Sequence, residues 1–346
     1  MQDRQREKFA ADELAVVLSR YDLGVIESIT EFPRGSRRSP KVGIVCERGK
    51  FLLKRRPRGQ AGGRRLEYAH RLQAHLSMTG FPLPRLVPPI TEEDTVLHYG
   101  GQVYELFDYV RGQSYLGTAE ETREAGAILA RFHQAVTGFN HVESPLEGDY
   151  HDANAVRTAL NATPGSLSGH DSVAGREGEV LGLAQELYDE YERACAVVER
   201  HGLRDWPSGV IHCDWHPGNM LFRNHGIVAV IDYDSARQSQ RVLDVANGTL
   251  QFSILSSRRV EDWPDELDED RAQAFLEGYT EGLEIGEAER ACLPCLMIEA
   301  LIAESVLPIA ATGSFGHYLG FEFMSMVRRK VGWMWKNADR LIATLV

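Results

Sequence analysis

The sequence predicts an α+β protein folded as two lobes, the first built mainly from strands and the second mainly from helices. Short apolar segments separated by turn residues dominate the first 109 residues, and long segments with helical spacing dominate the chain after residue 120. A single strand–turn–strand pattern interrupts those helices. We therefore expect an N-terminal antiparallel sheet with one helix over residues 1–109 and a mainly helical C-terminal lobe over residues 110–346.

The elements of the first lobe follow from periodicity and turn residues. Apolar residues at helical spacing predict a short opening helix over residues 12–21. The next strands are predicted as an antiparallel meander over residues 24–32, 41–47 and 50–55. A helix with one apolar side follows over residues 64–80 and stops at Gly80. Prolines keep residues 81–90 extended, and two strands within residues 95–110 complete a sheet of about five strands.

The second lobe is predicted from longer helical patterns. Helices are expected over residues 120–139 and 179–202, with a loop over residues 161–172 between them. After Asp244 the chain is expected to be almost wholly helical. The pair in "CLPC", Cys292 and Cys295, lies in an apolar helix-like run with no strand before it, so core packing is expected in place of redox chemistry.

Composition excludes several classes of function. The chain has 346 residues, of which 43% are hydrophobic, and a formal net charge of -12, which disfavours nucleic acid as the main partner. Five cysteines without regular spacing suit a reducing compartment. The start "MQDRQREKFAADE" has no signal-peptide core, and no uncharged apolar run reaches membrane length. We therefore expect a cytoplasmic protein without a membrane partner.

The segment "VIHCDWHPGNMLF", residues 210–222, carries the densest chemistry. Asp214 and Asn219 lie five positions apart, and a strand, a turn and an antiparallel return strand follow and end at Asp232. Such a hairpin returns the chain to its starting end, so these three side chains should share one edge. Their oxygens suit Mg²⁺, and phosphoryl transfer needs an Asp to accept a proton beside metal-binding Asn and Asp residues. The order matches a kinase catalytic loop in which Cys213 replaces the usual Arg.

The two histidines of this segment allow a zinc site as an alternative. His212 and His216 could contribute ligands, but zinc needs further clustered ligands and the other histidines are scattered. We therefore favour loop roles, with His212 bracing the backbone and His216 shaping the turn.

A kinase reading also requires a phosphate-binding lysine paired with a glutamate. Lys54 lies on the third predicted strand, and Glu67 is the acidic residue of the following helix. The alternative is that Glu67 pairs only with Arg71, four positions later, and that Lys54 is solvated.

The chain resembles the aminoglycoside phosphotransferase and homoserine kinase-like family, which has a protein-kinase-like fold. The resemblance rests on "GKFLLKRR", "GFPLPRLV", "ELFDYVRGQ", "VIHCDWHPGNMLF", "VAVIDYDSAR" and "VLDVANG". It implies that Asp214 is the catalytic base, that Asn219 and Asp232 bind Mg²⁺, and that Lys54, oriented by Glu67, contacts the ATP phosphates.

The same resemblance implies roles for residues outside the central motif. The backbone of Asp108 and Val110 would hold the adenine, and Asp244 would stabilise the catalytic loop. The turn that would cover the phosphates has one glycine, Gly35, where phosphate-binding loops often have more, so close backbone contact is not expected there. The hydroxyl of Ser36 could donate a hydrogen bond to the phosphates instead. Asp234 is a further candidate for metal or substrate binding.

These observations predict an ATP- and Mg²⁺-dependent transfer of phosphate to the hydroxyl group of a small molecule. The acidic and aromatic residues of the C-terminal half would favour a cationic acceptor. They are Glu299, Glu304, Tyr318, Phe321, Glu322, Trp333 and Trp335. Two alternatives remain open: a bacterial Ser/Thr protein kinase of the same fold, suggested by "DYDSAR" and "LDVANG", and a nucleotide-binding regulator without chemistry.

Overall fold

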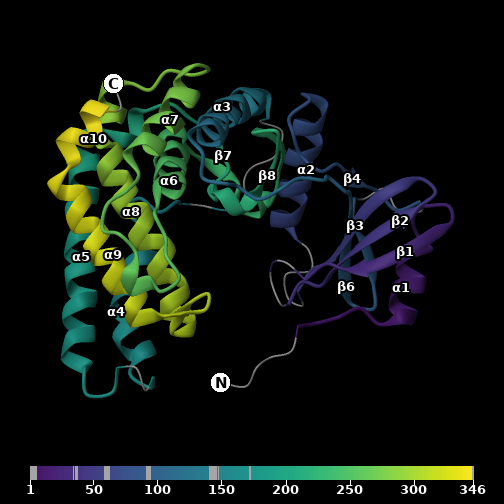
Figure 1. Cartoon of the computed structure of the whole chain (residues 1–346), viewed down its shortest axis with the longest axis horizontal. Helices are drawn as coiled ribbons and strands as arrows, with labels where there is room; N and C mark the ends of the chain where they lie inside the picture. Colours follow the sequence, from purple (N-terminus) through teal and green to yellow (C-terminus); the bar gives the residue numbers. More distant parts are fainter. Residues whose placement is uncertain are drawn as a thin grey trace.

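The computed structural model describes residues 6–33, 35, 38–57, 63–90, 95–139, 146, 148–170 and 173–344. Figure 1 shows a sheet with a short helix at one end of the molecule and a thick bundle of helices at the other. Between them lie helix α2 (Arg64–Met78) and short strands that include β7 (Ser208–Ile211) and β8 (Met220–Arg223). The predicted α+β, two-lobed fold is confirmed.

The N-terminal sheet has six antiparallel strands in the order β1-β2-β3-β6-β4, with β5 also paired to β6. The strands are β1 (Ile26–Glu31), β2 (Lys41–Cys46), β3 (Gly49–Arg55), β4 (Leu86–Val87), β5 (Leu97–Tyr99) and β6 (Gln102–Asp108). The extra strand, β4, lies in the proline-rich segment that was predicted to be extended. Proline is compatible with such a short strand at the edge of the sheet.

Helix α1 (Ala11–Leu18) packs against this sheet and is shorter than predicted. Val17 is fully buried in the core of the lobe. Glu13 Oε1 accepts hydrogen bonds from Arg55 Nη1 at 2.7 Å and from the Tyr104 hydroxyl at 2.7 Å. The helix is therefore tied to both β3 and β6.

Helix α2 (Arg64–Met78) lies between the sheet and the helical lobe, as Figure 1 shows. Its buried face includes Leu66, Leu72 and Leu76. Gly80 follows with φ +70, a left-handed conformation that a glycine adopts easily, and it ends the helix as predicted.

The helical lobe contains eight helices in the part of the chain that the structure describes. They are α3 (Ala119–Ala135), α4 (Asn154–Leu167), α5 (Glu177–Arg200), α6 (Arg241–Ser253), α7 (Glu269–Thr280), α8 (Glu287–Thr312), α9 (Gly320–Lys336) and α10 (Ala338–Thr344). The predicted loop over residues 161–172 is wrong for its first half, because α4 continues through Pro164. Leu160 and Leu167 are buried on one face of α4, so packing outweighs the missing backbone donor of the proline.

Helix α8 runs through the core of this lobe. It contains Cys292 and Cys295, both buried, so the expected core packing of "CLPC" is confirmed. By length and composition α8 could cross a membrane, but 83% of its apolar window is buried inside the protein. Such burial is typical of the central helix of a globular core.

Two short strand pairs carry the central motif. β7 (Ser208–Ile211) pairs with β10 (Arg237–Gln240), and β8 (Met220–Arg223) pairs with β9 (Gly226–Val230). At the β8–β9 turn, Asn224 and His225 have φ +50 and φ +64. Two consecutive left-handed residues suit the tight hairpin turn that the sequence predicts.

Candidate active site

A buried carboxylate holds the loop that follows β7. Asp244, on α6, accepts a hydrogen bond from the His212 backbone N–H to Oδ2 at 2.6 Å and one from the Cys213 N–H to Oδ1 at 2.8 Å. His133 Nε2 lies 3.2 Å from the same carboxylate. Cys213 has φ +64, a conformation that costs an L-residue energy and needs such support. Asp244 therefore has the stabilising position that the resemblance implied.

The side chain of His212 supports the loop by packing. It is fully buried against the rings of Phe132, Trp215 and Tyr233. Neither of its ring nitrogens has a hydrogen-bond partner among the described residues, and burial lowers the pKa of the imidazole. We expected His212 to brace the loop, and its backbone N–H does so by donating to Asp244. Its side chain is a neutral ring packed in an aromatic cluster.

His216 shapes the next turn, as predicted. Its Nδ1 accepts a hydrogen bond from the Gly218 N–H at 3.0 Å, and its Nε2 lies 3.5 Å from Asp214 Oδ1. Burial lowers the pKa of His216, but the hydrogen bond and charge of Asp214 raise it above its usual value overall. The zinc alternative loses support, because the His212 ring lies in an aromatic cluster, whereas the ring nitrogens of His216 face the Gly218 N–H and Asp214.

Asp214, Asn219 and Asp232 converge at the end of the β8–β9 hairpin. Asn219 Nδ2 donates to Asp214 Oδ2 at 2.8 Å and to the Asp214 carbonyl at 3.0 Å. The Ile231 N–H donates to the Asn219 carbonyl at 2.9 Å, which brings Asp232 beside Asn219. Burial raises the pKa of Asp214, but the hydrogen bond from His216 lowers it below its usual value overall. Asp214 is therefore ionised at neutral pH.

The donor set of this site fits Mg²⁺. Because its Nδ2 is engaged by Asp214, the Asn219 amide keeps its oxygen for another partner. The Asp232 carboxylate has no hydrogen bond or ion pair with any residue that the structure describes, and its backbone has φ +69. Two carboxylates and one amide oxygen are hard ligands of the kind that magnesium prefers beside phosphate oxygens.

The Lys54–Glu67 pair is not formed, which corrects the prediction. Lys54 instead lies 3.5 Å from Glu105 Oε2, and the two residues face each other across β3 and β6. Glu67 pairs with Arg71 at 2.6 Å on the exposed side of α2. The side of α2 that faces inward carries His70 in place of an acid. The alternative, in which Glu67 pairs with Arg71 and Lys54 is solvated, is thus right for Glu67. It is wrong for Lys54, because this side chain is only 22% exposed.

A second lysine that sequence reasoning missed faces the same side of the sheet. Lys41 on β2 lies directly opposite Lys54 on β3. Burial and the charge of Lys54 lower the pKa of Lys41, which has no ion-pair partner among the described residues. A Cβ atom placed on Gly35 would lie 2.8 Å from Lys41 Nζ, so Gly35 lies close to this lysine. Like charges placed opposite each other destabilise a sheet unless an anion lies between them.

Asp234, a further candidate for metal or substrate binding, contacts the N-terminal lobe. Both of its carboxylate oxygens accept hydrogen bonds from Arg56, each at 2.9 Å, and its carbonyl accepts one from Arg65 Nε at 2.7 Å. Such a bidentate pair is strong and directional, so Arg56 fixes the position of the Asp234 carboxylate. Asp234 therefore joins the two lobes in this structure.

The predicted adenine contacts, Asp108 and Val110, lie at the end of β6 and just after it. The Asp108 N–H donates to the Arg85 carbonyl at 2.9 Å. The Val110 N–H has no hydrogen-bond partner in the part of the chain that the structure describes, so it can still donate to a ligand. Ser36 lies outside the described residues.

A cavity of about 450 Å³ opens beside the catalytic loop. Pro217 of that loop forms part of its wall, and the rings of Trp263, Phe315 and Phe323 form another part. Its polar wall includes Glu304, whose carboxylate accepts hydrogen bonds from the side-chain amides of Asn247 and Gln251. Burial and the charge of Asp214 raise the pKa of Glu304 to about 7, although the hydrogen bonds from Asn247 and Gln251 act in the opposite direction.

Only part of the predicted acceptor surface lies at this cavity. Glu304 is in its wall, whereas Glu299 is buried elsewhere, 2.7 Å from His151 Nδ1. Phe321 packs under Arg176, and Tyr318 packs against Trp263 behind the cavity wall. Helical spacing could not separate these cases, because all of these positions lie on apolar helix faces or next to them.

A two-lobed α+β fold whose loop brings an Asp, an Asn and a second Asp together beside lysines of a sheet defines a kinase-type phosphotransferase. The model of the phosphotransferase enzyme family matches residues 29–288. The chain belongs to this phosphotransferase enzyme family.

Several homoserine kinases are similar to the chain. The one from Caulobacter sp. (strain K31) is 28% identical over 307 residues, covering 88% of this chain and 87% of that protein. The one from Rhizobium rhizogenes is 25% identical over 287 residues, covering 82% and 81%. The match to the homoserine kinase of Zymomonas mobilis, 23% identical, covers 65% of this chain and 63% of that enzyme, which is less than two thirds of its length.

Solved structures share the fold at low identity. An aminoglycoside phosphotransferase from Alicyclobacillus acidocaldarius has a TM-score of 0.67 at 18% identity, covering 99% of this chain and 97% of that chain. A microcompartment-associated aminopropanol kinase has a TM-score of 0.61 at 16% identity, covering 97% and 100%. These likenesses confirm the protein-kinase-like fold that the resemblance implied.

Proposed function

We propose that this protein uses ATP and Mg²⁺ to phosphorylate a hydroxyl group of a small molecule that also carries an amine. One observation carries the proposal. Asp214 is hydrogen-bonded to Asn219, on the loop whose Pro217 lines the cavity, and its charge acts on Glu304, whose carboxylate lies in the cavity wall. A base beside magnesium ligands and near an acidic, aromatic cavity suits phosphate transfer to an amino alcohol.

The roles of the residues follow from their chemistry. Asp214 would orient the acceptor hydroxyl and take its proton as the oxygen attacks the γ-phosphorus of ATP. The bond from that phosphorus to the bridging oxygen breaks, and ADP leaves. Asn219 and Asp232 would hold Mg²⁺, which neutralises charge on the phosphates. Lys54 and Lys41, opposite each other on the sheet, would contact the same phosphates.

The acceptor class is inferred from the cavity. A carboxylate in a partly apolar pocket attracts an ammonium group, and the aromatic rings offer faces that a cation also favours. Similar proteins are named as homoserine kinases and as an aminopropanol kinase, and both names describe acceptors with a hydroxyl and an amine. We therefore place amino alcohols and hydroxyl-bearing amino acids first, ahead of sugars and aminoglycosides, and expect the reaction in the cytoplasm.

The test is a screen for stabilisation and turnover. Thermal shift with ATP and Mg²⁺ present would be measured over amino alcohols, amino acids, sugars and aminoglycosides, because a ligand that binds only the folded state raises its stability. ADP release and mass spectrometry of the product would follow for each hit. We expect a phosphorylated amine-bearing alcohol, and loss of its formation in Asp214→Asn.

The matched control is Asp205→Asn, the same change at an exposed residue away from the cavity. It should keep wild-type turnover. The absence of ADP release with every acceptor would contradict the proposal. Transfer of phosphate to proteins of a lysate, lost in Asp214→Asn, would favour a protein kinase instead, and tight ATP binding without turnover would favour a regulator.

A further inference from the structure

A carboxylate on β6 contacts the phosphate-binding lysine where the sequence predicted one on α2. We infer that Glu105 is the positioning residue for Lys54, and that Arg56 links this pair to the catalytic lobe through Asp234. The inference rests on the proposed function, because it concerns how the lysine is held for ATP.

Glu105 is placed by strand register. Lys54 and Glu105 face each other in the antiparallel pair of β3 and β6, so their side chains lie on the same face of the sheet. Glu105 Oε1 accepts hydrogen bonds from Arg56 Nη2 at 2.9 Å and pairs with His70 Nε2 at 2.7 Å. Oε2 has no hydrogen bond among the described residues and faces Lys54 at 3.5 Å. One oxygen anchors the carboxylate, and the other is left for the lysine.

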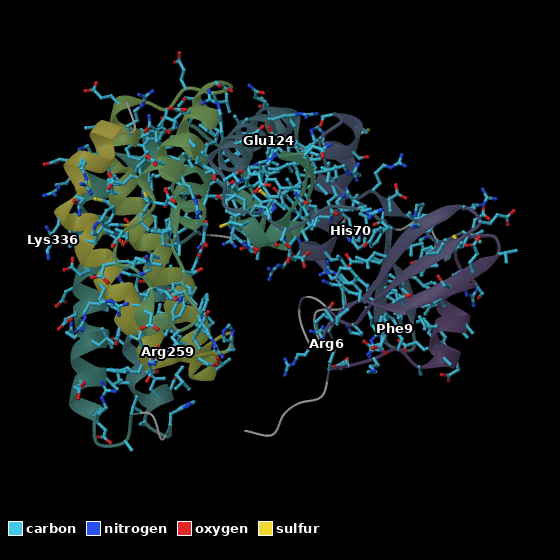
Figure 2. All side chains as sticks on the ribbon, viewed as in Figure 1. Arg6, Phe9, His70, Glu124, Arg259 and Lys336 are labelled. Atoms are coloured by element: carbon cyan, nitrogen blue, oxygen red, sulfur yellow. The ribbon has the colours of Figure 1, made fainter. Side chains whose placement is uncertain are left out.

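His70 explains why α2 does not supply the glutamate itself. Its side chain is 5% exposed, and Figure 2 places it between the sheet and the helical lobe. Its second nitrogen, Nδ1, lies 2.6 Å from the Thr95 hydroxyl. Both ring nitrogens are therefore engaged, which fixes the ring against Glu105. α2 thus reaches the lysine through a histidine that holds a carboxylate from the neighbouring strand.

The charges of this group favour a permanent anion at Glu105. The carboxylate is 1% exposed, and burial alone would raise its pKa. The charge of Lys54, the hydrogen bond from His70 and the charge of Arg56 lower the pKa of Glu105 far below its usual range. Removal of this carboxylate would leave Lys54 and Arg56 facing each other without the anion between them.

Arg56 extends the group to the other lobe. Its side chain is 7% exposed and donates to Glu105 and, with both terminal nitrogens, to Asp234. Asp234 lies two residues after Asp232 in the chain, on the segment that leaves the β8–β9 hairpin. The guanidinium therefore sets the position of the sheet, with its lysine, relative to the segment that contributes Asp232.

The experiment compares the same substitution at the two candidate glutamates. Glu105→Gln and Glu67→Gln both neutralise a glutamate of the N-terminal lobe, and Glu67 is exposed and, among the described residues, paired only with Arg71. ATP binding and slow ADP formation would be measured with Mg²⁺, without and with an acceptor. We expect Glu105→Gln to lower kcat by about 100-fold and to raise the KM for ATP several-fold, as misplacement of a catalytic group does. Glu67→Gln should stay within about twofold of wild type.

The KM for ATP distinguishes a misplaced Lys54 from a loss of folded protein. Loss of folded protein would lower the apparent kcat but leave the KM for ATP of the remaining folded fraction unchanged. If Glu105→Gln does not fold, Glu105→Asp can replace it, because Asp keeps the charge on a side chain that is shorter by one methylene group. We expect Glu105→Asp to lower kcat about tenfold. Equal activities of wild type and the Glu105 variants, or a larger loss in Glu67→Gln, would overturn the inference. A wild-type protein that neither binds nor hydrolyses ATP would instead refute the proposed function.

Discussion

The strongest test of the loop architecture is the removal of Asp244. The carboxylate is 1% exposed and accepts the backbone N–H groups of His212 and Cys213 at 2.6 and 2.8 Å. A hydrogen bond to a charged group contributes about 1.5–3 kcal/mol, and a buried donor left unsatisfied costs about 1–3 kcal/mol. Asp244→Ala would leave both of these buried N–H donors without an acceptor. We expect it to lower the free energy of unfolding by about 3–5 kcal/mol.

The same change should impair catalysis, because Asp214 follows Cys213 directly. Without its acceptors, the left-handed conformation of Cys213 loses its support, and a shift of about 1 Å in Asp214 would lower kcat about 100-fold. Urea denaturation followed by circular dichroism, together with the kinase assay, would measure both effects. The control Asp189→Ala removes an exposed helix carboxylate bonded to Gln185 and should cost about 0.5 kcal/mol or less. A loss below about 1 kcal/mol in Asp244→Ala would refute the reasoning.

Three further predictions test packing, phosphate binding and the acceptor cavity. A Cβ atom on Gly126 would lie 1.9 Å from a carbonyl oxygen of α7, so Gly126→Ala should destabilise the protein by about 2–3 kcal/mol, measured by thermal unfolding. The control is Gly182→Ala on α5, where the new methyl group meets open space and should not destabilise the protein. Lys41→Met should raise the KM for ATP about tenfold, because it removes a charge that would contact the phosphates. Lys50→Met, at an exposed lysine, should leave this KM unchanged. Equal KM values for Lys41→Met and the wild type would contradict the phosphate role of Lys41. Burial raises the pKa of Glu304 to about 7. As pH rises from about 6 to about 8 the carboxylate ionises, so the KM of an amine-bearing acceptor should fall, and Glu304→Gln should flatten that dependence.

The convergence of Asp214, Asn219 and Asp232 was predictable because it depends on local structure. The two-residue turn fixes the pairing of Arg223 with Gly226, and after a register shift between Leu221 and Phe222 the return strand still brings Val230 opposite Met220, the residue after Asn219. The role of Asp244 was reached differently, through resemblance, since nothing in its own segment indicates which backbone groups it accepts. The roles of these residues in catalysis stay predictions until the variants are measured.

The partner of Lys54 was not predictable, because it depends on contacts between segments far apart in the chain. Glu105 and Lys54 meet only when β6 inserts beside β3, a strand order that the sequence pattern does not encode. Glu67 had suitable spacing, but the rotation of α2 turns it toward solvent and turns His70 inward. A helix rotates by about 100° per residue, so a small difference in its orientation decides which side chain reaches the sheet.

By itself the sequence determined the α+β class, the order of most elements and the composition of the catalytic loop, since these follow from periodicity and from residues close together in the chain. The tertiary structure alone decided that Lys41 lies opposite Lys54, that Asp234 joins the lobes through Arg56, and that Glu304 lines the cavity while Glu299 does not. Each of these depends on strand register, helix rotation or packing between lobes. Those quantities are set by burial of the whole core, to which residues from every part of the chain contribute.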